Sequence, residues 1–208
     1  FGQDKIYLMG HSWGSFIGIQ AAAQAPELYT AYFGVAQVSR QLESEKEAYT
    51  YMLEQFRQAE DKNMVQKLEN YPIPEFNSIP DAYRFLRDEA MHKLGVGTMH
   101  NMRSVVTGIF LPTWQNREYT LSEKIGIWRG KWAAYSSAMW NQMIATDLTA
   151  KVAKLDIPVY CFHGIYDYPV TYALSKDYYQ KFRPLRKDFI LSNIRPTVQY
   201  LKNRIMLK

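Results

Sequence analysis

Cysteine is almost absent from the chain: one residue, Cys161, occurs among 208. A single cysteine cannot form an internal disulfide framework or a metal site built on several cysteines, and it is typical of a reducing compartment, so we expect a cytoplasmic location. No apolar run reaches the roughly 20 residues of a membrane-spanning helix. Metal-ligand clusters, glycine-rich phosphate loops and internal repeats are not evident, so the sequence predicts no metal and no cofactor.

Positive charge is unevenly distributed. The net charge is +5, but residues 183–208 carry seven of the 25 basic residues and one of the 20 acidic ones. Positions 1–182 therefore hold 18 basic and 19 acidic residues, a net charge of −1. A basic tail can contact nucleic acid or anionic lipid. Because the body is neutral and the tail has another explanation, given below, we expect no nucleic-acid partner.

The most informative stretch is Gly10-His11-Ser12-Trp13-Gly14. An apolar run precedes it and a helical pattern rich in small residues follows it, which is the strand–turn–helix context of a G-x-S-x-G nucleophile elbow. So tight a turn strains the serine backbone, and we expect both glycines to be needed because the turn leaves no room for side chains. The sequence predicts Ser12 as the nucleophile, with Gly10, His11 and Gly14 completing the elbow. The simpler alternative is a Gly/Ser turn into a helix.

Helical signals follow a buried strand that is predicted over 32–38. Asp81 is predicted to cap a helix whose apolar positions include Phe85, and Gly95 is predicted to end it. Thr120 and Glu123 have the spacing of a capping box, which opens a long amphipathic stretch.

The whole segment 39–150 has the pattern of a helical block between two strand regions, which is typical of a cap over an active site. Tryptophans at helical spacing more often pack than bind, but we expect some to line a moderately apolar substrate pocket. Four of the five lie in this block: Trp114, Trp128, Trp132 and Trp140.

A second informative stretch begins with a buried strand predicted over 159–162. Asp167 lies in the turn just after it, the place of a triad acid that holds the tautomer of a histidine and stabilises the imidazolium. The order Ser…Asp is also the order in hydrolases with this elbow. The alternative is a turn or N-cap aspartate before a helix over 172–182.

These residues resemble the α/β-hydrolase fold family, and within it the capped prolyl-aminopeptidase-like serine hydrolases. The resemblance covers 1–182 and depends on G-H-S-W-G at 10–14, D-I-P-V-Y-C-F-H-G-I-Y-D at 156–167, and the helical block between them. It implies an α/β fold, a parallel sheet with flanking helices. The core would comprise 1–38 and 151–208, with 39–150 inserted as a helical cap.

The resemblance also implies acyl transfer to water, without a cofactor, on a small-molecule or short-peptide substrate. Ser12 would attack a carbonyl, and an oxyanion hole that includes the backbone N–H of Trp13 would hold the negative charge. In this fold the nucleophile strand lies centrally, after several others. We therefore interpret the chain as lacking N-terminal strands, together with the early loop that supplies a second oxyanion donor.

The expected catalytic histidine is missing. The four histidines are His11, His92, His100 and His163, and none follows Asp167. We expect His11 to point away from the base position, His163 to be structural, and His92 and His100 to face solvent.

The genetic code offers an explanation for the tail. In the family the histidine occurs in a segment similar to S-x-H-x-P followed by E-x-P. If the reading frame starts at the third base of each codon, the codons that can encode residues 194–205 permit the translation S-A-H-S-P-I-F-E-E-P-D. In the same shifted frame, the codons for residues 188–191 permit F-Y-T-F. Our hypothesis is that 183–208 is a frameshifted translation, and that the proper frame encodes the histidine across Pro196 and Thr197.

Two interpretations of function remain. The first is a serine hydrolase acting on an ester, amide or short peptide. If it is an aminopeptidase, it needs an acidic residue of the cap that pairs with the ammonium group of the substrate. Candidates for this residue are Glu118, Glu123 and Asp147. The second is a non-catalytic ligand-binding protein of the same fold. Because the histidine and one oxyanion donor are missing, we expect the chain as given to be an inactive fragment. The substrate and oligomeric state stay open.

Overall fold

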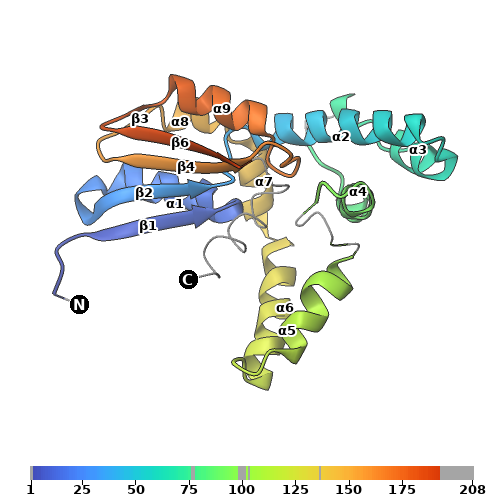
Figure 1. Ribbon diagram of the computed structural model, residues 1–208, viewed down its shortest axis with the longest axis horizontal. Coiled ribbons are helices and arrows are strands. Elements are labelled where there is room, and N and C mark those ends of the chain that lie inside the picture. The colour runs from blue at the N-terminus through green and yellow to red at the C-terminus, as the bar shows by residue number, and fades with distance from the viewer. Residues whose placement is uncertain (1, 76–77, 98–101, 103, 136, 193–208) are drawn as a thin grey trace.

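The computed structural model describes residues 2–75, 78–97, 102, 104–135 and 137–192 (Figure 1). Its centre is a four-stranded parallel sheet in the order β1-β2-β4-β6. The strands are β1 (Ile6–His11), β2 (Tyr29–Val35), β4 (Val159–Gly164) and β6 (Lys187–Ser192). Two short strands, β3 (Lys154–Leu155) and β5 (Arg183–Pro184), form a second parallel pair. The α/β architecture predicted from the sequence is therefore confirmed.

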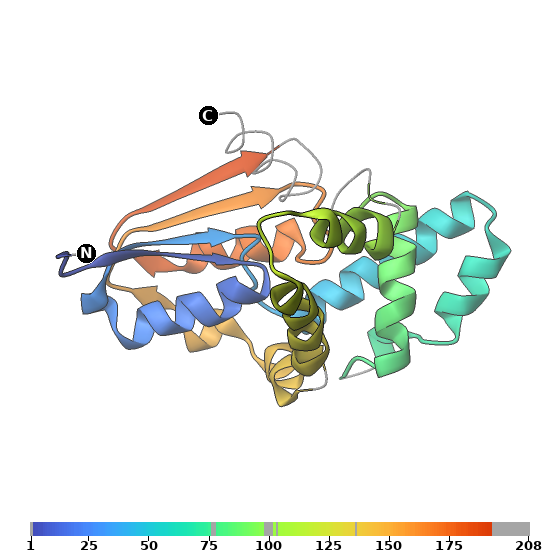
Figure 2. The ribbon, with the colours of Figure 1, turned by 90° about the horizontal axis from the view of Figure 1, so that it is seen from below.

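Two helices cover one face of this sheet, α1 (Trp13–Gln24) and α9 (Tyr172–Lys181) (Figures 1 and 2). Gly18 allows α1 to approach closely, since a Cβ there would lie 3.1 Å from the ring of Tyr32 on β2. The α9 helix packs on the next strands, where the rings of Tyr179 and Phe189 are 4.8 Å apart. Burial of this face fixes the register that brings the strand ends together.

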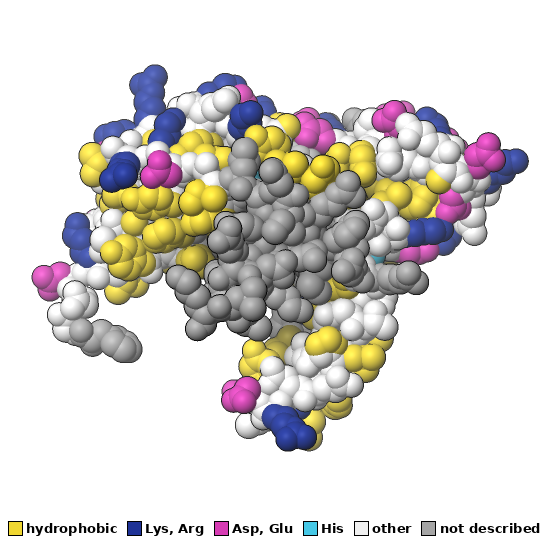
Figure 3. All heavy atoms as spheres, in the orientation of Figure 1, with side chains coloured by type: hydrophobic (Ala, Val, Ile, Leu, Met, Phe, Trp, Pro, Cys, Tyr) yellow, Lys and Arg dark blue, Asp and Glu magenta, His cyan; other side chains and the backbone are white. Residues whose placement is uncertain are grey.

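The opposite face of the sheet is largely aromatic and partly exposed. The ring of Phe33 on β2 stacks on Tyr160 and Phe162 of β4, with centroids 5.2 and 6.4 Å apart. On β1, Tyr7 and Met9 are 69% and 60% exposed. Figure 3 shows hydrophobic side chains gathered over the strands on this side of the molecule.

Between β2 and β3 the described chain is helical. Its longer helices are α2 (Gln41–Gln58), α3 (Lys62–Glu69), α4 (Asp81–Lys93), α5 (Leu111–Gln115), α6 (Leu121–Tyr135), α7 (Ala138–Ala145) and α8 (Leu148–Lys151). A π-helical segment, η3 (Val106–Phe110), runs into α5, and a 3-10 turn, η2 (Ile73–Glu75), lies between α3 and α4. A further 3-10 turn, η1 (Pro26–Leu28), lies before β2. Buried side chains of α2, α3, α4 and α7 share one hydrophobic cluster with the sheet, whereas α5 and α6 project from the body (Figure 1). Over the described residues, no helix has the length and apolar character needed to cross a membrane.

Several local predictions can be compared with these elements. Gly95 follows the end of α4 with a φ of 69°, as expected for a residue that ends a helix. The capping box is confirmed: the N–H of Thr120 donates to Glu123 Oε2 at 2.8 Å, and the N–H of Glu123 donates to Thr120 Oγ1 at 3.3 Å. Both bonds satisfy N–H groups at the start of α6.

Other local predictions were wrong. Asp81 is the first residue of α4 rather than its cap, which is Pro80, and it pairs with Arg84 instead. Phe85 is 76% exposed because the face of α4 that packs inward carries Tyr83 and Leu86. The predicted strand over 32–38 begins earlier, at Tyr29, and ends at Val35, since the following Ala36 turns the chain with a φ of 48°.

Candidate active site

Ser12 lies in the turn between β1 and α1. Its backbone has φ 51° and ψ −119°, a region that residues with a side chain rarely adopt. The Ser12 N–H donates to the carbonyl of Val35 at 2.9 Å, so the last bond of the β1–β2 pair reaches the serine itself. The side chain is half-buried. The strained turn is therefore fixed by the sheet on one side and by the helix on the other.

The two glycines of the elbow differ in what they allow. A Cβ on Gly10 would lie 2.5 Å from the carbonyl oxygen of Gly14 and 2.7 Å from Cα of Ser15, both backbone atoms that cannot move away. A Cβ on Gly14 would meet nothing within 4 Å. The expectation that both positions exclude a side chain is therefore right for Gly10 and wrong for Gly14, which lies in the first turn of α1 with open space around its Cα.

Buried polar contacts that were not predicted from the sequence hold the elbow in place. Ser15 Oγ donates to the carbonyl of Ser12 at 2.6 Å and accepts the N–H of Val38 at 2.9 Å. The Tyr32 hydroxyl lies 3.0 Å from the Ser15 carbonyl and 2.8 Å from Gln37 Oε1. These bonds tie the start of α1 to the loop after β2. A serine and a tyrosine within apolar runs carry no separate sequence signal.

Asp167 follows β4 in a buried turn and is 7% exposed. Its N–H donates to the carbonyl of Gly164 at 3.1 Å, and its Oδ1 accepts the N–H of Val170 at 3.1 Å. The residue that caps α9 is Thr171, so Asp167 is not that helix's N-cap. The strands β1 and β4 are parallel, so their carboxyl ends lie at the same end of the sheet. Ser12 follows β1 and Asp167 follows β4, and both residues therefore lie at that end.

A cavity of about 210 Å³ opens beside the elbow. Ser12 and Trp13 lie on one side of it, and Pro169 and Val170 bring the loop of Asp167 to it. The apolar part of the remaining lining comes from the loop after β2, from α4, from the segment before α5 and from α7. These residues are Val38, Met91, Val105, Ile109, Trp140 and Met143.

Two tryptophans meet at this cavity: Trp140, one of the four in the helical block that were expected to supply some of the lining, and Trp13 of the elbow. The rings of Trp13 and Trp140 are in edge contact, with centroids 5.8 Å apart. The guanidinium of Arg84 lies 4.9 Å from the centre of the Trp140 ring. By contrast, Trp128 packs on Phe110 within the arm formed by α5 and α6.

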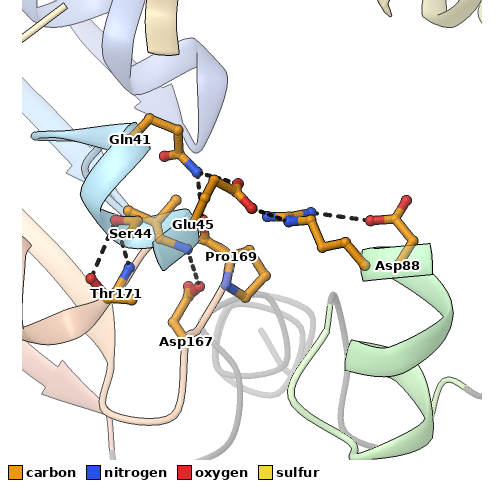
Figure 4. A network of polar contacts seen from close by, with 9 residues as sticks. Gln41, Ser44, Glu45, Asp88, Asp167, Pro169 and Thr171 are labelled. Atoms are coloured by element: carbon orange, nitrogen blue, oxygen red, sulfur yellow. Dashed lines mark hydrogen bonds and ion pairs between the residues drawn. The ribbon is translucent and has the colours of Figure 1, made fainter. Parts of the chain in front are cut away.

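The polar part of the lining includes Gln41, Arg87, Asp88, His92 and Lys131. Arg87 Nε lies 2.5 Å from Oε2 of Glu45, which is completely buried, and Arg87 Nη1 lies 3.1 Å from Asp88 Oδ1 (Figure 4). Burial works against the charge of Arg87, but the two carboxylates outweigh it and hold the guanidinium pKa above its usual value. This network joins α2 to α4 across the polar end of the cavity.

The histidines occupy three kinds of position. His163 is 1% exposed, and its Nε2 lies 2.9 Å from the carbonyl of Val170; burial lowers its pKa, with Asp167 and that hydrogen bond opposing. His92 was expected to face solvent but is 7% exposed, because the turn after α4 brings Gly97 against its ring. His11 is exposed at the end of β1. His100 lies outside the described residues.

Comparison with known proteins agrees with this geometry. A family model described as alpha/beta hydrolase fold matches residues 1–193, and the chain belongs to that family. The chain is similar to "Probable aminopeptidase YbaC" of Bacillus subtilis (strain 168), with 24% identity over 190 residues that cover 90% of this chain and 58% of that protein.

Two solved structures also resemble it. A proline iminopeptidase from Mycobacterium smegmatis matches with a TM-score of 0.53 and 10% identity over 99% of this chain and 63% of its own. A lipase-esterase related protein from Clostridium acetobutylicum matches with a TM-score of 0.51 and 13% identity over 99% of this chain and 64% of its own. At these identities the likeness shows the fold. The chain spans about three fifths of the length of these relatives.

Proposed function

We propose that this chain carries the nucleophile and the acid of a serine hydrolase that transfers an acyl group to water. The observation that carries the proposal is Ser12: a strained serine at a strand-to-helix turn, on the wall of a cavity. Strain of this kind costs about 1–3 kcal/mol, is retained only where the surrounding structure enforces it, and is concentrated at functional sites. In this mechanism Ser12 attacks the substrate carbonyl and forms an acyl-enzyme, which water then cleaves.

The negative charge that forms on the carbonyl oxygen needs donors. Trp13 is the first residue of α1, and N–H groups in the first turn of a helix have no acceptor within the helix. We therefore assign its N–H to the oxyanion hole. Asp167 would hold and orient the protonated base. We also propose that 39–150 acts as the cap, because it supplies most of the cavity wall that faces Ser12.

The base is proposed to be the histidine encoded in the shifted frame across Pro196 and Thr197, outside the described residues. The topology supports this position, since β6 runs parallel to β4 and Ser192 is paired with Gly164. The strand β6 therefore ends at the same end of the sheet as the strands that precede Ser12 and Asp167. The DNA around codons 181–208 tests the hypothesis: a one- or two-base slip supports it, whereas an intact frame leaves the serine without its base.

The substrate is proposed to be a small ester, amide or peptide whose apolar part fits the cavity. Aminopeptidase activity is the narrower proposal, and it is supported by the similarity to a protein named as a probable aminopeptidase. It requires an acidic side chain that binds the ammonium group of the substrate. Two earlier candidates have other roles, because Glu123 caps α6 and Asp147 caps α8. Asp88 lines the cavity, and we assign it this role.

Hydrolysis of aminoacyl and acyl p-nitroanilides or p-nitrophenyl esters by the product of the full-length gene, read in the corrected frame, is the test of activity. We expect turnover that Ser12→Ala abolishes, with the fold unchanged by circular dichroism. The 208-residue chain as given should show no turnover. Binding without turnover in the frame-corrected protein would favour the alternative, a ligand-binding protein of this fold.

A further inference from the structure

One peptide group of the loop after β4 joins the carboxylate of Asp167 to the helix α2. Asp167 Oδ1 accepts the N–H of Val170 at 3.1 Å. The carbonyl oxygen of Pro169 belongs to the same peptide group, and it accepts a hydrogen bond from Gln41 Nε2 at 2.8 Å (Figure 4). Because this peptide group is planar and trans, its C=O and N–H point in opposite directions. Gln41 therefore holds one end of the group whose other end donates to Asp167.

The side chain of Gln41 is itself fixed in orientation. It is 3% exposed, and its Nε2 also donates to Glu45 Oε1 at 2.9 Å, one turn further along α2. A carbonyl oxygen can only accept, so the nitrogen end of the Gln41 amide must face Pro169. The other carboxylate oxygen of Glu45 lies 2.5 Å from Arg87 Nε on α4. A continuous chain of polar contacts therefore runs from α4 through α2 to the loop of Asp167 (Figure 4).

A second set of contacts holds the same loop to the same face of α2. Ser44 Oγ accepts the N–H of Thr171 at 3.3 Å and lies 3.2 Å from Thr171 Oγ1, and both residues are buried. The ring of Tyr51 stacks on that of Tyr168, with centroids 3.9 Å apart. Residues 41, 44 and 51 share one helical face, because three and seven positions separate them. The loop is thus held at 168, 169 and 171, on both sides of the N–H that binds Asp167.

We propose that Gln41 is a positioning residue for the acid of the reaction: it holds the Pro169–Val170 peptide group and thereby sets the direction of the Asp167 carboxylate. The inference rests on the proposed function, in which Asp167 orients the protonated base. Apolar contacts alone would bury this loop, but hydrogen bonds restrict its angles as well as its distance from α2. The helix that follows the loop after β2 therefore helps to align an acid that belongs to β4.

The kinetic test uses the product of the full-length gene, read in the corrected frame. Gln41→Met retains the size of the side chain but removes both donated hydrogen bonds. We expect kcat to fall by roughly tenfold, since a small misplacement of a catalytic group is costly. The acidic limb of the pH dependence of kcat/KM should move to lower pH, because a poorly aligned Asp167 stabilises the protonated base less.

Ser44→Ala is a second variant that reaches the loop from elsewhere. Ser44 lies outside the described lining of the cavity, whereas Gln41 is part of it. We therefore expect Ser44→Ala to lower kcat, by less than Gln41→Met does, and to move the acidic limb in the same direction without changing KM. This variant also keeps the inference testable if Gln41→Met does not fold.

Amide hydrogen exchange at Val170, measured by NMR, tests the link without turnover. The N–H of Val170 is bound to Asp167 in the native protein. If Gln41 holds its peptide group, exchange at Val170 should be roughly tenfold faster in Gln41→Met, because local opening becomes easier.

Two controls separate alignment from a loss of stability. Gln58→Met changes an exposed glutamine of α2 whose Nε2 donates to Glu54, four residues away, at 3.3 Å. Tyr178→Phe removes a buried hydrogen bond of 2.7 Å to the carbonyl of Val152, and thermal unfolding measures how far it and the other variants are destabilised. Both controls should keep the wild-type kcat and the wild-type acidic limb.

The outcomes are distinguishable. Wild-type kcat and pH dependence in Gln41→Met and Ser44→Ala overturn the inference and leave Ser12 and Asp167 in their proposed roles. A loss of kcat without movement of the acidic limb, matched by Tyr178→Phe, shows that the contacts only stabilise the fold and also overturns it. So does unchanged exchange at Val170 in Gln41→Met. Absence of turnover in the wild type overturns the proposed function, and the role of Asp167 as the acid with it.

Discussion

Removal of one member of the buried ion pair should be strongly destabilising. In Arg87→Met the carboxylate of Glu45, 0% exposed in the native protein, loses the cation at 2.5 Å and retains, among the described residues, only the donor from Gln41. Breaking a buried pair in this way costs about 3–5 kcal/mol, a large part of the roughly 5–15 kcal/mol that stabilises a typical protein. We expect a loss of about 3 kcal/mol in the free energy of unfolding, measured by urea titration and tryptophan fluorescence.

Two comparisons make this prediction sharp. In Arg87→Met/Glu45→Met no charge is left buried, so stability should return to near the wild-type value or above it, because apolar replacement of a buried pair is often neutral. Arg57→Met breaks an exposed pair with Glu69 and should cost less than about 1 kcal/mol. If Arg87→Met is no more destabilising than Arg57→Met, the pair does not hold α2 and α4 together as described.

Three further predictions concern single residues. Ser12→Gly should be more stable than Ser12→Ala by about 1 kcal/mol. Glycine relieves a backbone strain of about 1–3 kcal/mol, but it loses about 0.5–1 kcal/mol more conformational entropy on folding. Equal midpoints of urea unfolding would contradict the strained turn. Burial lowers the pKa of His163, against the opposing effect of Asp167, so as pH falls below about 6.5 the unfolded state takes up a proton that the folded state does not. As the pH decreases, this residue should therefore lower the free energy of unfolding by up to about 1.4 kcal/mol per pH unit. The loss of stability between about pH 7 and pH 5 should be smaller in His163→Gln. Identical pH profiles for the two proteins would exclude a buried neutral histidine. Burial raises the pKa of the Cys161 thiol to about 12, so Ellman's reagent at about pH 8 should leave it unmodified until urea unfolds the protein, and rapid reaction in the native state would show that β4 is exposed.

Features that depend on a few adjacent residues were predictable from the sequence. The capping box at Thr120 and the helix end at Gly95 are local devices, and each appears as expected. The elbow also follows from local chemistry, because only glycine fits at position 10 against the backbone of Gly14 and Ser15. The family and the parallel sheet followed from such motifs and their order.

Features that depend on which segments meet were not predictable. The Glu45–Arg87 pair joins residues 42 positions apart on two amphipathic helices, and nothing in either helix identifies the other as its partner. His92 is buried by the turn that follows its own helix, while Phe85 is exposed although it is apolar. Helical periodicity predicts which residues share a face, but it does not predict which other segment covers that face.

The most direct test of the central claim is covalent labelling of Ser12 by a fluorophosphonate, followed by mass spectrometry, in the product of the full-length gene translated in the frame that the DNA establishes. We predict one label per chain, located on the peptide that contains Ser12 and lost in Ser12→Ala, whereas the 208-residue chain as given should remain unlabelled. Stoichiometric labelling of the given chain would contradict its expected inactivity. A folded, frame-corrected protein in which Ser12 stays unlabelled would contradict its role as the nucleophile.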